Sequence, residues 1–82
     1  MTKKEINELL QDFLKENEED FSRIDFNPEL LDRLSKLHVF AAPRERLIDE
    51  DKLNRFAEAA KFFRERTGYE VWFEVRVFFH VK

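Results

Sequence analysis

The sequence predicts an α+β fold in which three helices pack on one face of a small antiparallel sheet with a long C-terminal strand. Three segments carry apolar residues at helical spacing behind an N-terminal start signal, and the last segment alternates without interruption. The 82 residues (1–82) are expected to form a single domain, since two domains would not fit into this length. We expect the sheet to be completed between two copies of the chain.

The first helix is expected from Thr2 to about Asn17. Thr2 and Glu5 have the spacing of a capping box, in which the two residues bond each other's backbone N–H groups. The acidic run 16–20 follows at the C-terminal end, where the helix dipole disfavours negative charge. This run indicates either a frayed, solvated helix end or a docking point for a basic partner.

Two further helices follow. Asn27 is a strong N-cap and Pro28 suits the first helical position, so a second helix is expected to begin there. Residues 38–42 are ambiguous between the end of this helix and a short strand. The third helix is expected from Asp49 to Gly68, where a left-handed backbone conformation is favourable. The expected core consists of Ile6, Leu9, Leu10, Phe13, Leu30, Leu34, Leu53, Phe56, Ala60, Phe63, Val71, Phe73, Val75, Val77 and Phe79.

The C-terminal segment 69–82 is predicted to be one strand. Its odd-numbered positions are all aromatic or β-branched, and no Gly, Pro, Asn or Asp interrupts it. At about 3.3 Å per residue it would span roughly 46 Å, whereas a compact globule of this chain length is roughly 30 Å across. The only other strand candidate, residues 37–42, is too short to pair along its length. The strand is therefore expected to need a partner from outside the chain.

Charge patterning favours one register for pairing with a second copy. An antiparallel pairing about a two-fold axis at Val75 places Glu74 opposite Arg76, a favourable cross-strand pair. A shift by one pair places Glu74 or Arg76 opposite its own copy, which like charges disfavour. The predicted interface comprises the polar face of the strand and the residue on the axis: Glu70, Trp72, Glu74, Val75, Arg76, Phe78 and His80.

These features predict a non-catalytic protein-interaction module that forms a homodimer through antiparallel pairing of strand 69–82. Two alternatives are open for this strand: pairing within the chain, and capture of a foreign peptide strand. Complete helix start signals and a single glycine are typical of a designed scaffold, whereas ten phenylalanines argue against design. The sequence is equally compatible with a natural and an engineered origin.

The contrasting interpretation is a small nucleic-acid-binding protein. Basic residues with aromatic neighbours lie before and within the third helix, and Trp72 offers a ring on which a base could stack. The candidate phosphate contacts are Arg44, Arg46, Lys61, Arg64 and Arg66. Glutamates interrupt both clusters and the chain carries a net charge of −3, which weakens the attraction for phosphate.

Composition argues against an enzyme, a cofactor and a metal site. The chain has no cysteine and one glycine, which excludes thiol chemistry and glycine-rich phosphate loops. His38 and His80 lack the spacing of metal ligands. No apolar run approaches the roughly 20 residues of a membrane helix, and there is no signal-peptide core. We therefore expect a cytoplasmic protein without a small-molecule substrate.

Overall fold

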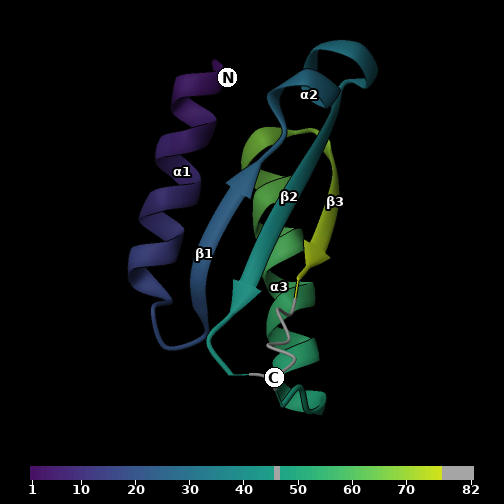
Figure 1. Ribbon diagram of the computed structural model, residues 1–82. Helices are drawn as coiled ribbons and strands as arrows, with labels where there is room; N and C mark the ends of the chain where they lie inside the picture. Colours follow the sequence, from purple (N-terminus) through teal and green to yellow (C-terminus); the bar gives the residue numbers. More distant parts are fainter. Residues whose placement is uncertain (46, 77–82) are drawn as a thin grey trace, which may run out of the picture.

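A computed structural model describes residues 1–45 and 47–76 as three helices and three strands (Figure 1). The α+β class and the three predicted helices are confirmed. The elements in chain order are α1 (Lys3–Glu16), β1 (Phe21–Phe26), α2 (Pro28–Leu34), β2 (Lys36–Pro43), α3 (Glu50–Thr67) and β3 (Glu70–Val75).

The helix starts and stops follow the predicted local chemistry. Thr2 and Glu5 form the capping box, with each backbone N–H 3.1 Å from the other's side-chain oxygen. Asn27 accepts a hydrogen bond from the backbone of α2, and Asp49 does the same for α3. Gly68 ends α3 with a φ of 76°, a left-handed conformation that glycine adopts at little cost.

The sheet is mixed rather than antiparallel as predicted. Its strand order is β1-β2-β3, in which β1 and β2 are antiparallel while β2 and β3 are parallel. The pair is parallel because α3 connects the end of β2 to the start of β3. The helix runs back along the sheet, so both strands begin at the same end (Figure 1). The ambiguous residues 38–42 belong to β2, because α2 ends at Leu34 and Ser35 takes a left-handed conformation there.

Strand β3 has a partner within the chain, which corrects the expectation that it lacks one. Residues 70–75 pair in register with residues 36–41 of β2. The pairing occupies the inner edge of β3 and leaves its outer edge at the margin of the sheet. Residues 77–82, on which the predicted strand length depends, lie outside the described residues.

Strand β1 was not predicted, and a β-bulge explains why. The register of β1 against β2 shifts between Phe21 and Arg23. The bulge inserts one residue, so Phe21 and Ile24 are both buried although they are three positions apart. The period-two pattern that identifies a strand from sequence is therefore absent from this segment.

The core lies on one face of the sheet, under α1 and α3. Phe13 of α1 and Phe63 of α3 meet there with ring centroids 4.8 Å apart, and α2 contributes Leu31 from the end of the sheet. Two predicted core residues are exposed instead: Leu34 by 53% and Leu53 by 57%. The buried members of the core are Ile6, Leu10, Phe21, Ile24, Leu31, Leu37, Val39, Ala41, Phe56, Ala59 and Phe63.

Candidate interaction surface

The second face of the sheet is open. In Figure 1, α3 lies behind β2 and β3, and among the described elements no helix packs on the opposite face. Alternation along the paired strands determines which side chains point there. We call this surface the open face; it consists of Arg23, Asp25, Lys36, His38, Phe40, Ala42, Glu70, Trp72, Glu74 and Arg76.

Two neighbouring rows of the open face have opposite charge. The carboxylate row runs across the three strands and consists of Asp25, Phe40 and Glu74. The arginine row follows it and consists of Arg23, Ala42 and Arg76. A hollow of about 370 Å³ lies at these two rows, with the small Ala42 among its lining residues. The other residues that line it are Arg23, Asp25, Phe26, Phe40, Ala41 and Arg76. The surface thus carries an aromatic ring at the wall of a hollow.

The charges of the open face are paired within the chain. Arg23 bonds to Asp25, and Arg76 Nε lies 2.7 Å from Glu74 Oε2. Lys36 Nζ makes a longer contact of 3.8 Å with the carboxylate of the residue opposite it on β3. The lysine and arginine side chains of the face therefore equal its carboxylates in number: Arg23, Lys36 and Arg76 against Asp25, Glu70 and Glu74. A surface of this kind holds an electrostatic pattern without attracting free ions strongly.

An aromatic strip crosses the open face from β2 to β3. The ring of His38 lies 4.3 Å from that of Phe40 and 5.8 Å from that of Trp72. The Lys36 ammonium lies 4.6 Å from the Trp72 ring, and the Arg76 guanidinium lies 4.2 Å from the Phe40 ring. Trp72 is nevertheless 46% exposed. Its size and exposure make it a candidate contact for a partner.

The outer edge of β3 presents regular backbone groups. The N–H of Arg76 donates to the Ala41 carbonyl of β2 over 2.9 Å, so the backbone groups of Arg76 point toward β2. Successive residues of a strand direct their N–H and C=O groups to opposite edges. The groups of Val71, Phe73 and Val75 therefore face outward. Within residues 1–45 and 47–76, no other strand pairs with this edge.

Most of the predicted interface residues lie together. Glu70, Trp72, Glu74 and Arg76 are on the open face, whereas Val75 packs against the core on the covered face. The two remaining predicted residues, Phe78 and His80, lie outside the described residues. Sequence reasoning did not include the half of the open face that β1 and β2 contribute. The apolar residues Leu37, Val39 and Ala41, at every second position of β2, were the sequence signal that could have revealed it.

The described cations considered for nucleic-acid binding do not share one surface with Trp72. The full set is Arg44, Arg46, Lys61, Arg64 and Arg66, of which Arg46 lies outside the described residues. Those of α3 lie on the helix that covers one face of the sheet, whereas Trp72 lies on the other face. Arg44 follows β2 at the end of the sheet where α3 begins, while Arg66 is in the last turn of that helix.

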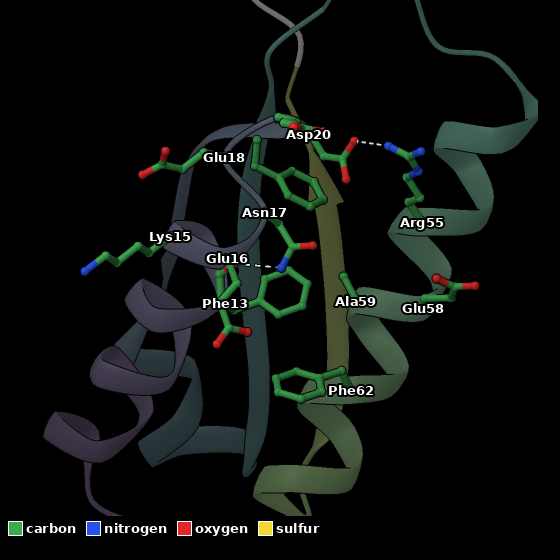
Figure 2. Close-up of a pocket in the computed structure, with 12 residues that line it drawn as sticks. Phe13, Lys15, Glu16, Asn17, Glu18, Asp20, Arg55, Glu58, Ala59 and Phe62 are labelled. Carbon is green, nitrogen blue, oxygen red and sulfur yellow. Dashed lines mark hydrogen bonds and ion pairs between the residues drawn. The ribbon is translucent and has the colours of Figure 1, made fainter.

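A second hollow, of about 750 Å³, opens between α1 and α3 (Figure 2). Phenylalanine rings form its floor, and the acidic run 16–20 contributes to its rim. Asp20 accepts a hydrogen bond from Arg55, which raises the pKa of that guanidinium. The Asn17 side chain donates to the Phe13 carbonyl over 2.8 Å. These bonds hold the turn after α1 against both helices.

The described part of the chain contains neither a cluster of metal ligands nor a membrane-spanning helix. No three histidine, cysteine, aspartate or glutamate side chains in the described part of the chain are placed to hold a metal ion. Among the helices of residues 1–45 and 47–76, none combines the length and apolarity needed to cross a membrane. Comparisons of the chain with models of protein families, with curated proteins and with solved structures found no match.

Proposed function

We propose that the protein is a non-catalytic interaction module that forms a homodimer through its β3 strands. The observation that carries this proposal is the outer edge of β3, where Val71, Phe73 and Val75 direct backbone groups away from β2. An edge strand with regular extended backbone is a template for a further strand. Pairing of two such edges joins two three-stranded sheets into one of six strands.

The proposed register has its two-fold axis at Val75. Because Val75 faces the outer edge, it exchanges both N–H···O=C bonds with Val75 of the second copy. Glu74 then lies opposite Arg76 of the second copy. Each of these side chains already pairs with the other inside its own chain, so the dimer gathers two carboxylates and two guanidinium groups around the axis. Such cross-strand pairs contribute roughly 0.2–1 kcal/mol each.

The exposed flank of α3 supports the same arrangement. Phe62 faces α1, since its ring lies 5.2 Å from that of Phe13. Leu53 precedes Phe62 by nine residues, about two and a half helical turns, and therefore lies on the opposite flank, toward the outer edge of β3. Edge-to-edge pairing about an axis perpendicular to the sheet brings this flank next to its copy. Burial of Leu53 in the dimer explains why it is 57% exposed in the single chain.

The position of Leu53 along α3 also suits the proposed axis. The rings of Phe56 and Phe63 each lie 6.4 Å from that of Phe73, and α3 runs opposite to β3. Leu53 comes one turn before Phe56, so it lies toward the Val75 end of β3. The two copies of Leu53 therefore approach each other near the axis.

Leu53→Glu is expected to halve the native mass at concentrations where the unsubstituted protein is fully associated. Loss of two buried leucine contacts should weaken the edge dimer roughly 100-fold. The chain should still fold, because the side chain is largely exposed in the single copy. Native mass spectrometry or sedimentation across a dilution series measures the effect.

Leu34→Glu is the matched control, because Leu34 is 53% exposed on α2, which precedes the Lys36–Glu70 end of the paired strands, the end opposite Val75. This variant should keep the native mass of the unsubstituted protein. A protein that has the mass of one chain at every concentration contradicts the proposal. Equal masses for the Leu53 and Leu34 variants contradict the placement of α3 at the dimer interface.

A further inference from the structure

We infer that the open face is a second self-association surface, on which two copies pack face to face with Phe40 of each copy in the hollow of the other. Ala42 and Phe40, in neighbouring rows of the same strand, both line the hollow, and Arg23 and Arg76 lie on either side of Ala42. A ring beside a hollow of about 370 Å³ makes the surface complementary to itself. The occupant of the face is therefore a second copy of this chain.

The charges of the two rows select the orientation. We place a two-fold axis midway between the two sheets. It runs perpendicular to the strands and passes between the two rows. This axis puts each carboxylate row over the arginine row of the other copy. Asp25 then faces Arg23 of the second copy. On the other side of the ring, Glu74 faces Arg76 of the second copy. Packed sheets cross at about 30° because of their twist, and rows next to the axis are displaced least by this angle.

The alternative in-plane axis, parallel to the strands, is disfavoured. That operation lays β1 over β3 of the second copy and places each row over the same row of the second copy. Asp25 then faces Glu74, and Arg23 faces Arg76, so both rows are opposed by like charges. Like charges that face each other across a buried interface repel strongly. The charge pattern thus favours one of the two in-plane two-fold axes about which two copies could pack face to face.

Face-to-face pairing also removes apolar surface from water. Trp72 is 46% exposed, and Phe40 and Ala42 are half-buried. The charged side chains bury less favourably, but the four charged residues of the two rows enter the interface with a partner from their own chain and gain one from the other. Apolar burial therefore supplies affinity, whereas the rows supply orientation.

The face pairing stands independently of the edge dimer, but the number of copies rests on both. The two-fold axis of the edge dimer passes between the two copies of Val75, perpendicular to the sheet. Val75 pairs with Ala41, which lies between Phe40 and Ala42. The two-fold axis of the face pairing passes between the Phe40 and Ala42 rows, at the level of Ala41 and Val75. The two axes therefore cross at a right angle. Crossed two-fold axes generate a closed assembly of four copies, a common symmetry of soluble oligomers.

Ala42→Trp tests the face pairing, because an indole at this position fills the hollow. The variant should have half the native mass of the unsubstituted protein, and Ala42→Trp with Leu53→Glu should have the mass of one chain. Ala42→Ser is the matched control; it keeps the hollow open and should keep the full mass. Far-UV circular dichroism shows whether each variant folds.

A charge exchange on β1 gives a second readout, distant from the outer edge of β3. Asp25→Arg alone opposes two cations across the face and should halve the mass, whereas Arg23→Asp with Asp25→Arg restores complementarity and should restore the mass. The inference is overturned if Ala42→Trp keeps the full mass, or if the single and double β1 variants associate equally. Failure of the edge dimer is distinguished by an Ala42→Trp variant that already has the mass of one chain, because the face pairing would then be the only association of the unsubstituted protein.

Discussion

Val75→Pro is expected to abolish edge pairing while preserving the fold of the single chain. Proline has no backbone N–H, so both hydrogen bonds at the proposed axis are lost and two carbonyls are left unpaired. Two net hydrogen bonds with these unpaired groups correspond to a weakening of roughly 100-fold or more. Proline is tolerated on an edge strand where its N–H would face outward, and the bond from Arg76 to Ala41 remains.

Val75→Ala is the control for this substitution. Both substitutions change the half-buried valine side chain, but alanine retains the backbone N–H group that proline lacks. In sedimentation analysis the proline variant should have half the native mass of the alanine variant at equal concentration. Equal masses, with both variants folded by circular dichroism, would show that the outer edge of β3 does not pair through its backbone.

Phe21→Ala is expected to lower the free energy of unfolding by about 3–5 kcal/mol, the usual cost of removing a buried phenylalanine ring. Phe21 is 1% exposed, and its ring lies 5.5 Å from that of Phe56 and 6.1 Å from that of Phe73. It therefore joins β1 to both α3 and β3. Urea denaturation followed by circular dichroism measures the change.

Ser22→Ala, at the neighbouring position of the bulge, provides the comparison. Ser22 is exposed, and its hydroxyl makes only a 3.3 Å contact with the Ala42 carbonyl. Its substitution should change the free energy of unfolding by less than about 0.5 kcal/mol. A Phe21→Ala effect as small as that of Ser22→Ala would contradict the packing of β1 against the core.

The helices could be predicted from sequence because their signals are local. A capping residue such as Thr2 or Asp49 and the stop at Gly68 act within a few positions of the chain. Strand β1 could not be predicted, because the bulge after Phe21 removes the alternation on which a prediction depends. The parallel pairing of β3 was missed for a different reason. It arises from the path of α3, which a period-two pattern does not contain.

The candidate surface was predictable only in part. Alternation in the last segment placed Trp72 and Glu74 on one face. The neighbours that give this face its pattern, Asp25 on β1 and Phe40 on β2, come from strands whose order and register depend on tertiary packing. Exposure of Leu53 likewise follows from how α3 rotates against the sheet. Burial within a helix pattern is assigned by spacing alone, which cannot tell a core flank from an interface flank.

Residue-resolved amide hydrogen exchange across a concentration series tests the central claim most directly. The amides of Val71, Phe73 and Val75 face the outer edge, whereas that of Arg76 is bonded to β2. If β3 pairs with a second copy about Val75, the outward amide of Val75 should gain protection as concentration rises, because it donates to the second copy. Outward amides that exchange equally fast at every concentration, beside an Arg76 amide that stays protected, would contradict the account.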